Sequence, residues 1–315
     1  MQKVTIVIPN YNERRLLENC LKTLENQTYT DFKVLIIDNG STDGSKEIIS
    51  DTLDMEIVSL ETNLGFCGAV NLGIQMTNTP YIILLNNDTE TDRYFVETLL
   101  KAIERSEKIF SCGAQMIDFQ NHKILDNAGD LYTAMGWAVA RGKGKRCIDY
   151  EKKKRVFSCC AGAAIYRMDI LNQIGGLDEH HFAYLEDVDL GYRARIHGFE
   201  NWYIPEAKVY HVGSATTGAR YNEKKVFLAA RNTIFVIYKN MPVLQLVLNV
   251  PFIFIGMLIK TLFFVRKGFG EDYCKGILEG ICDCKKCWKV KFHMKNLSNY
   301  FKIQLELWCN LVRII

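Results

Sequence analysis

The sequence lacks a large excess of either charge. Lys and Arg number 39, Asp and Glu number 36, and the formal net charge of the 315 residues is +3. A protein that binds nucleic acid through its phosphates carries a strong basic excess, so we expect no nucleic-acid partner. Low-complexity segments are also absent. Hydrophobic residues make up 48% and charged residues 24% of the chain, which excludes a disordered or collagen-like protein.

Two common nucleotide-binding motifs are missing. The G-x-G-x-x-G fingerprint of dinucleotide-binding folds fails, because Gly142 and Gly144 are followed by Cys147 where the third glycine is required. The phosphate loop G-x-x-x-x-G-K-[ST] fails as well, because Gly142-Lys143 is followed by Gly144 and position 137 is Trp. These absences argue against a dehydrogenase and against a P-loop nucleotidase.

The start of the sequence has no long apolar run and no small-residue cleavage site of a secretory signal. We therefore expect the eleven cysteines to be reduced thiols in the cytoplasm. Four of them cluster near the C-terminus, at Cys274, Cys282, Cys284 and Cys287. The Cys284-x-x-Cys287 spacing suits a structural zinc site that His293 or Cys309 could complete, but no second C-x-x-C pair is present. Reduced or palmitoylated thiols are the alternative that we favour.

Apolar runs alternate with stretches of helical spacing over the first 90 residues. We expect strands at Val4–Ile8, Phe32–Ile37, Ile57–Leu60 and Tyr81–Leu85, and helices at Glu13–Asn26, Ser45–Thr52 and Gly68–Met76. This order predicts an α/β fold with a mainly parallel sheet flanked by helices. Ligands in such sheets bind beyond the carboxyl ends of the strands, where polar clusters occur at 10–13, 38–40 and 86–88.

Two later segments are harder to interpret. Residues 111–157 are rich in glycine and predict a long loop over the sheet, in which the basic stretch 141–155 could contact an acceptor phosphate or be solvated. Residues 241–265 are apolar but contain Gln245, Asn249 and Pro251. A spanning helix needs about 20 mostly apolar residues. We favour a hairpin in the plane of a membrane surface over a spanning pair or a soluble helical subdomain.

The C-terminal tail is basic. From residue 260 to 315 it carries eleven Lys and Arg against five Asp and Glu, whereas the rest of the chain is mildly acidic. Such a tail could meet an anionic membrane surface or form a solvated helix.

Five blocks of sequence carry a resemblance to a known family. They are VIPNYN at 7–12, IDNGSTDGS at 37–45, NLGFCGAVNLGI at 63–74, LLNNDT at 84–89 and GGLDEHHFAYLEDVDLGYRA at 175–194, followed by VYHVGS at 209–214. In this order they resemble the inverting glycosyltransferases of family 2, and above all the rhamnosyltransferase-type branch of bacterial and archaeal surface polysaccharide synthesis. The resemblance covers residues 4–242. It implies a GT-A domain over 1–240 and a helical, membrane-associating region over 241–315.

The resemblance implies a site for a nucleoside-diphosphate sugar at the strand ends. Pro9, Tyr11 and Glu13 would contact the base and ribose. Asp38 would accept from the N3–H group that uracil and thymine share, so the donor is expected to be a UDP- or dTDP-sugar. Asn39 departs from the acidic pair that is common in the family and brings no charge. The remaining donor contacts are expected from Asn63, Gly65, Asn71 and Asn87, and Asn63 and Asn71 could hold a loop instead of touching the ribose. Asp43 is expected to be a turn or cap residue.

The metal and catalytic residues follow from the same resemblance. Asn86-Asn87-Asp88 stands at the family's Asp-x-Asp position, where Asp88 would hold Mg²⁺ or Mn²⁺ with His211, and Ser214 would assist at a phosphate. Asp187 would be the base that takes the proton of the acceptor hydroxyl, with Glu186 orienting the acceptor. We expect Asp189 to pair with Arg193 instead. Residues 159–164 match the small-residue floor of the acceptor cleft, where the two cysteines would be buried thiols.

The expected function is inverting transfer of rhamnose or another hexose to a lipid-linked glycan or oligosaccharide acceptor. We expect the protein to lie in the cytoplasm, peripheral to the inner face of the cell membrane. The main alternative is a non-catalytic scaffold that binds a sugar nucleotide or glycan, which the single charge in residues 86–88 favours. A sugar nucleotidyltransferase is less consistent, because residues 9–12 do not supply its Gly-rich phosphate loop.

Overall fold

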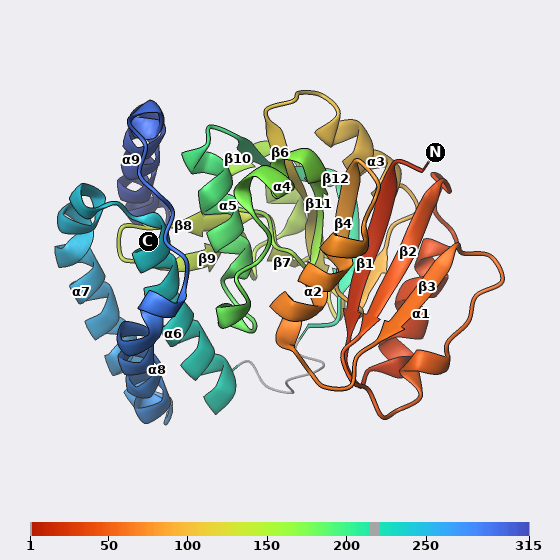
Figure 1. The fold of residues 1–315 in the computed structure, drawn as a ribbon, viewed down its shortest axis with the longest axis horizontal. Helices are drawn as coiled ribbons and strands as arrows, with labels where there is room; N and C mark the ends of the chain where they lie inside the picture. The colour runs from red at the N-terminus through yellow and green to blue at the C-terminus, as the bar shows by residue number, and fades with distance from the viewer. Residues whose placement is uncertain (1, 214–220, 315) are drawn as a thin grey trace.

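The computed structural model describes residues 2–213 and 221–314. A mixed sheet runs through its centre, helices cover both faces of the sheet, and a cluster of C-terminal helices lies at one end (Figure 1). The strands are β1 (Val4–Asn10), β2 (Phe32–Asp38), β3 (Met55–Ser59), β4 (Tyr81–Leu85), β5 (Thr89–Thr91), β6 (Ile109–Asp118), β7 (Leu125–Asn127), β8 (Asp130–Tyr132), β9 (Ala138–Ala140), β10 (Lys154–Val156), β11 (Ala163–Arg167) and β12 (Glu200–His211). The helices are α1 (Arg14–Leu24), α2 (Gly65–Met76), α3 (Phe95–Ile103), α4 (Met168–Ile174), α5 (Glu186–Ile196), α6 (Glu223–Asn240), α7 (Val243–Arg266), α8 (Gly270–Asp283) and α9 (Leu297–Arg313).

The N-terminal half of the sheet is parallel, as the alternation of elements predicts. β1 lies between β2 and β4, and β3 pairs with β2. Side chains alternate across β1, so that Ile6 packs toward α1 and α3 and Val7 packs toward α2. Gly73 of α2 permits this contact, because a Cβ atom there would lie 2.4 Å from Cγ1 of Val7. All these strands direct their carboxyl ends to the same edge of the sheet.

The second half of the sheet corrects two predictions. Residues 111–157 are not a long loop, because β6 is a ten-residue strand inside the sheet and β7 to β10 follow it. Small and polar residues such as Ser111, Gly113 and Gln115 interrupt its apolar run and conceal the strand in the sequence. The sheet is mixed rather than mainly parallel, since β11 runs antiparallel to both β4 and β6.

The helix expected at 45–52, in the first half of the chain, was also wrong: only a 3-10 turn at Ser45–Glu47 forms.

The helices after residue 240 pack onto the preceding part of the chain. Tyr132 of β8, Tyr192 of α5 and Leu307 of α9 belong to one buried apolar cluster. In α8, Gly276 lies against the α6 backbone, where a Cβ would be 2.4 Å from the Phe227 carbonyl oxygen. The predicted boundary at 240/241 falls between α6 and α7, and the helices on its two sides share this core.

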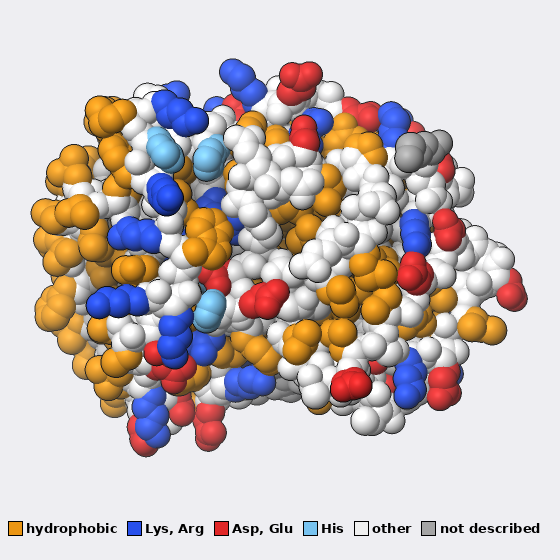
Figure 2. Space-filling view, in the orientation of Figure 1, with side chains coloured by type: hydrophobic (Ala, Val, Ile, Leu, Met, Phe, Trp, Pro, Cys, Tyr) orange, Lys and Arg blue, Asp and Glu red, His pale blue; other side chains and the backbone are white. Residues whose placement is uncertain are grey.

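Helix α7 buries polar residues and exposes apolar ones, the reverse of the pattern that a surface helix has in water. Its polar residues Gln245 and Asn249 are buried and hydrogen-bond to Tyr192 and Gln304. Before Arg266 at its end, its exposed large side chains are apolar: Val243, Leu244, Val247, Leu248, Val250, Phe254, Ile255, Leu258, Ile259, Leu262, Phe263 and Val265. In the described residues this is the helix that is long and apolar enough to cross a membrane. Figure 2 shows hydrophobic side chains gathered over this end of the molecule.

Candidate functional site

Three strand ends meet through their polar side chains at the carboxyl edge of the sheet. Asn10, at the end of β1, donates to Oδ1 of Asp38 at 3.1 Å and accepts from Nδ2 of Asn87 at 2.7 Å. The second carboxylate oxygen of Asp38 accepts from the backbone N–H of Ser41 at 3.0 Å. All of these side chains are buried. The structure therefore brings Asp38 and Asn87 together as predicted, and it adds Asn10 as the residue that joins them.

The loop after β1 carries the predicted base-contacting residues. Tyr11 is exposed, and Pro9 and Glu13 are half-buried. Asn12 has a φ of 53° and fixes the loop by accepting from the backbone N–H of Thr42 at 2.8 Å. The ring of Tyr11 is thus available for stacking at the mouth of the site. Burial raises the pKa of Glu13, and the nearby Asp88 and Asp43 raise it further.

Asp43 is the turn residue that the sequence predicts. One of its oxygens accepts from the backbone N–H of Arg14 at 2.8 Å and the other accepts from Ser45. Burial raises the pKa of Asp43, but these hydrogen bonds outweigh burial and lower it overall.

Like Asn87, the three other expected donor-site asparagines make hydrogen bonds within the protein. Asn39 accepts from the backbone N–H of Leu64 at 2.8 Å and donates to Oδ1 of Asn63 at 3.0 Å. The Asn71 side chain donates to the backbone C=O of Leu177 and accepts from its backbone N–H, both at 2.9 Å. Gly65 has a φ of 77°, and a Cβ there would lie 2.6 Å from the backbone of Phe182. These residues connect the donor-side loops to residues 177–182, which lead to the predicted base.

Asp88 and His211 meet at the edge of the sheet. Nε2 of His211, at the end of β12, lies 3.3 Å from Oδ1 of Asp88. That buried oxygen has no hydrogen-bond partner within the described residues. Nδ1 of His211 makes a 2.9 Å hydrogen bond with Oδ2 of Asp126 on β7, and Lys143 pairs with the other oxygen of Asp126. Ser214 lies outside the described residues.

This arrangement suits a divalent cation. A ligating histidine commonly has its second ring nitrogen fixed by a carboxylate, as Asp126 does here for His211. Oδ1 of Asp88, which faces His211 but accepts no hydrogen bond from the described residues, is the type of oxygen donor that Mg²⁺ or Mn²⁺ prefers. Without a cation, burial lowers the pKa of His211, but Asp126 and Asp88 outweigh it and raise the pKa to about 9. A cation that binds Nε2 therefore has to displace the proton of the imidazole. Nothing in the sequence singles out Asp126, because the glycine-rich segment that contains it predicts a loop.

The predicted base, Asp187, is half-buried at the start of α5, beside the buried carboxyls of Glu186 and Asp130. Asp187 accepts from the backbone N–H of Val188 at 2.7 Å. Burial raises the pKa of Asp187, and hydrogen bonds from the Val188 and Ala161 backbones only partly oppose this. Glu186 and Asp130 have raised pKa values because both are buried and both lie near Asp187. Asp130 is on β8, in the segment that sequence patterns did not resolve.

The predicted floor of the acceptor cleft lies beside Asp187. Burial raises the pKa of Cys160, and the Asp187 carboxylate raises it further. Of the two cysteines expected to be buried, Cys159 is buried and Cys160 is half-buried. A carboxyl group surrounded by small, apolar neighbours is protonated more readily than one in water, which is the condition that tunes a general base toward neutral pH.

The loop before Asp187 is strained and tied to α6. Phe182, Tyr184 and Leu185 all have positive φ values, of 61°, 75° and 66°. Each such residue costs about 1–3 kcal/mol and persists only where its surroundings hold it. Nδ2 of the fully buried Asn232 lies 2.8–2.9 Å from the carbonyl oxygens of His181, Ala183 and Tyr184. Arg231 donates to the carbonyls of His180 and His181.

We expect Asn232→Ala to lower kcat about 10- to 100-fold, because a shift of about 1 Å in a reacting group can cost a factor of 10². The affinity for the nucleotide should stay within about twofold, since Asn232 contacts none of the donor-side residues. Steady-state kinetics with separate kcat and KM values measure this. Thr233→Ala is the matched control, because that hydroxyl donates to Ala229 within its own helix. Equal losses in the two variants would contradict the positioning role.

Asp189 pairs with Arg193 as predicted, at 3.0 Å, and the pair belongs to a larger buried network. Lys239 of α6 lies 2.9 Å from both Asp189 and Asp178. Arg193 also donates to the carbonyls of residues 174–176. The Trp288 ring, from the segment after α8, covers Lys239 with a 4.0 Å separation from its centroid to Nζ. This network joins α5, α6 and the loop at 174–178.

Comparison with known proteins identifies a family for this chain. The sequence model described as glycosyl transferase family 2 matches residues 5–175. The N-acetylglucosaminyl-diphospho-decaprenol L-rhamnosyltransferase of Mycobacterium tuberculosis is 26% identical over 264 residues, covering 72% of this chain and 84% of the relative. The O-antigen chain rhamnosyltransferase RfbN of Salmonella typhimurium is 27% identical over 241 residues, covering 72% and 73%.

Solved structures share the fold. A mannosyltransferase from Pyrobaculum calidifontis in complex with GDP-Man and Mn²⁺ aligns with a TM-score of 0.56 at 12% identity, covering 90% of this chain and 87% of that chain. GalNAc-T7 with UDP, GalNAc and Mn²⁺ aligns at 0.58 and 14% identity, covering 75% and 47%. The fold is thus a GT-A-like α/β fold with a mixed sheet. With the family model matching more than half of its length, the chain belongs to glycosyltransferase family 2.

Proposed function

We propose that this protein transfers a hexose, with rhamnose as the first candidate, from a UDP- or dTDP-sugar to a hydroxyl of a lipid-linked glycan, with inversion. The observation that carries the proposal is the pair of acidic centres. One is Asp88 with His211 and Asp126, and the other is the buried group around Asp187. The two rhamnosyltransferase relatives support the sugar, and the decaprenol in one relative's name supports a lipid-linked acceptor.

The reaction needs one proton transfer and one displacement. The acceptor oxygen attacks the anomeric carbon, its proton passes to the Asp187 carboxylate, and the bond to the nucleoside diphosphate breaks with both electrons. A single displacement of this kind inverts the anomeric centre. Asn10, Asp38 and Asn87 shape the base-binding edge, and Tyr11 offers a ring for stacking.

Asp88 and His211 are the residues that would hold Mg²⁺ or Mn²⁺. When bound, the cation neutralises charge on the departing diphosphate. Asp126 keeps the imidazole of His211 oriented, and Lys143 keeps Asp126 in place. With one carboxylate at residues 86–88, the protein alone supplies few ligands, so the donor diphosphate would have to supply others.

Calorimetric titration of UDP and dTDP with and without Mn²⁺ tests the donor site. We expect Mn²⁺ to tighten nucleotide binding by at least about tenfold, and Asp88→Asn to remove this gain, because the variant lacks the charge that holds the cation. Asp31→Asn, which changes an exposed carboxylate before β2, is the control. Binding of neither nucleotide would overturn the donor assignment. Binding without turnover would favour the non-catalytic scaffold instead.

We also propose that α7, α8 and α9 rest on the cytoplasmic face of the cell membrane, where a lipid-linked acceptor is held. The support is the outward apolar face of α7 with its inward Gln245 and Asn249, an arrangement that water alone would not favour. Exposed apolar residues continue on the neighbouring helices at Leu278, Ile281, Phe301, Leu305 and Val312. Exposed basic residues such as Arg266, Lys267 and Lys302 accompany them and match an anionic lipid surface.

Co-sedimentation with anionic phospholipid vesicles measures this interaction. Phe254, Leu258 and Leu262 are four residues apart on the exposed face of α7. Transfer of each side chain from water into lipid contributes about 1.5–3 kcal/mol to the binding free energy. We expect the triple Ser variant to bind at least about 100-fold more weakly. A matched triple Ser variant at Ile49, Tyr94 and Ile148 changes exposed apolar residues outside α7–α9. Wild-type binding by the α7 variant would refute the docking face.

A further inference from the structure

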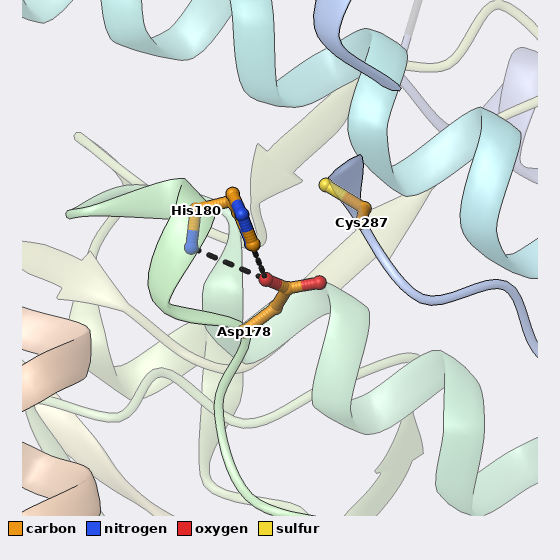
Figure 3. A group of neighbouring side chains, drawn as sticks. All are labelled: Asp178, His180 and Cys287. Atoms are coloured by element: carbon orange, nitrogen blue, oxygen red, sulfur yellow. Dashed lines mark hydrogen bonds and ion pairs between the residues drawn. The ribbon is translucent and has the colours of Figure 1, made fainter. Parts of the chain in front are cut away.

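Three side chains with metal-binding atoms meet away from the donor site. Asp178 and His180 come from the loop between α4 and α5, and Cys287 comes from the segment that follows α8 (Figure 3). One ligand atom from each lies within 4.8 Å of the others. Within the described residues this is the group of three such side chains whose ligand atoms lie this close together, and it shares no residue with the Asp88 and His211 pair.

This group replaces the zinc set that the sequence suggested. Cys287 does belong to a C-x-x-C pair, but Cys284 is not part of the group, and Cys309 is exposed. The partners of Cys287 are instead contributed by a loop more than 100 residues earlier. Spacing within a sequence cannot reveal ligands that come together only through the packing of α8 against α6.

We propose that Asp178, His180 and Cys287 form a binding site for Zn²⁺ or a similar borderline cation. An oxygen, an imidazole nitrogen and a sulfur are the donor types that Zn²⁺ accepts, and three protein ligands with one water complete a tetrahedral shell. Asp178 and Cys287 are buried, whereas the His180 side chain is 49% exposed. His180 therefore lies at the solvent side, where an ion and its water can enter.

The two oxygens of Asp178 have different partners. Its Oδ2 atom pairs with Nζ of Lys239 at 2.9 Å, which keeps the carboxylate charged in the folded protein. Its Oδ1 atom accepts from the backbone N–H of His180 at 3.2 Å, and its side-chain hydrogen bond is to Nδ1 of His180 at 2.9 Å (Figure 3). A cation between Oδ1 and Nδ1 replaces that hydrogen bond and leaves the Lys239 pair intact. Cys287 gives up its proton on binding, and the thiolate offsets one of the two added charges.

The site would join two parts of the chain. Asp178 and His180 precede the strained loop at 182–185, and Cys287 belongs to the connection between α8 and α9. The backbone of Val290 already donates to the Lys239 carbonyl at 3.0 Å. A bound ion adds a cross-link at this contact, so binding to the folded chain stabilises the attachment of the C-terminal helices.

Titration of the metal-free full-length protein with Co²⁺ tests the site without any transferase assay. Co²⁺ at a thiolate gives a charge-transfer absorption that the sulfur-free Asp88 and His211 site cannot give. We expect one equivalent to produce this absorption, Zn²⁺ to displace it, and Cys287→Ser to remove it. Cys309→Ser should behave as wild type. The absence of the band, or its survival in Cys287→Ser, would overturn the proposal.

A second variant guards against simple misfolding. His180→Ala changes a half-exposed side chain, so the fold should be retained, and we expect it to weaken Co²⁺ binding by more than about tenfold. Zn²⁺ should raise the unfolding temperature of wild type and of Cys284→Ser, but not that of His180→Ala. An equal rise in His180→Ala would show that Zn²⁺ stabilises the chain elsewhere and would refute this ligand set.

Discussion

Asp187→Asn is expected to lower kcat for sugar transfer about 10²- to 10⁴-fold, the range that one positioned general base contributes. The amide cannot accept the acceptor hydroxyl's proton, while its size and its contact with the Val188 backbone are nearly preserved. Nucleotide affinity should stay unchanged, because the donor-side hydrogen bonds run through Asn10, Asp38 and Asn87. Kinetics with the purified membrane-extracted acceptor, together with calorimetric UDP or dTDP binding, separate the two effects.

Asp169→Asn provides a closely matched control. Asp169 stands at the start of α4, and its Oδ1 accepts from the next backbone N–H at 2.7 Å, as Asp187 does at the start of α5. Asp169 is exposed, and we expect its variant to retain the wild-type rate. Wild-type turnover by Asp187→Asn would exclude Asp187 as the base. Loss in both variants would point to helix stability instead.

The rate should also depend on pH in a defined direction. Burial raises the pKa of Asp187 above the ordinary range of an aspartate, and only the unprotonated carboxylate can accept a proton. The transfer rate should therefore rise as pH increases through this raised pKa. An acid limb that ends near the ordinary aspartate pKa would indicate that the carboxylate is solvated in the working enzyme.

The sequence predicted those parts of the site that lie at regular strand ends. Asp38 and Asp88 follow apolar runs that can only be buried strands, and parallel strands place their ends at one edge. Asp126 and Asp130 are equally part of the two acidic centres, yet they were not found. They lie on strands of three residues, which are too short for any periodicity to appear.

The role of the asparagines was another feature that residue type could not settle. Asn39, Asn63 and Asn71 could contact a ribose or hold a loop, and their amides prove to be engaged with the backbone and with one another. Asn232 belongs to no recognisable sequence motif. We infer its importance from its hydrogen bonds to three carbonyls of the strained loop, which lies next to α6 only in the folded chain.

The second large expected effect concerns stability. Lys239→Met should reduce the free energy of unfolding by about 3–5 kcal/mol, the cost of removing one partner from a buried ion pair. The Lys239 side chain is fully buried between Asp178 and Asp189, which are themselves buried. Met has a similar length and can pack beneath Trp288, so the loss reports the uncompensated carboxylates rather than a cavity. Urea unfolding followed by fluorescence measures it.

The pH dependence of unfolding identifies the cause. Burial raises the pKa of Asp189, but Arg193 and Lys239 outweigh it and bring the pKa well below its usual range. A depressed pKa in the folded state contributes stability that is present above the unfolded pKa of about 3.9 and is lost as pH falls below it. We expect Lys239→Met to lose less stability than wild type on acidification, because protonation of Asp178 and Asp189 removes the unpaired charge.

The control Lys22→Met, at an exposed position of α1, should follow the wild-type curve. A constant difference between Lys239→Met and wild type at all pH values would mean that packing, not charge, is what Lys239 contributes.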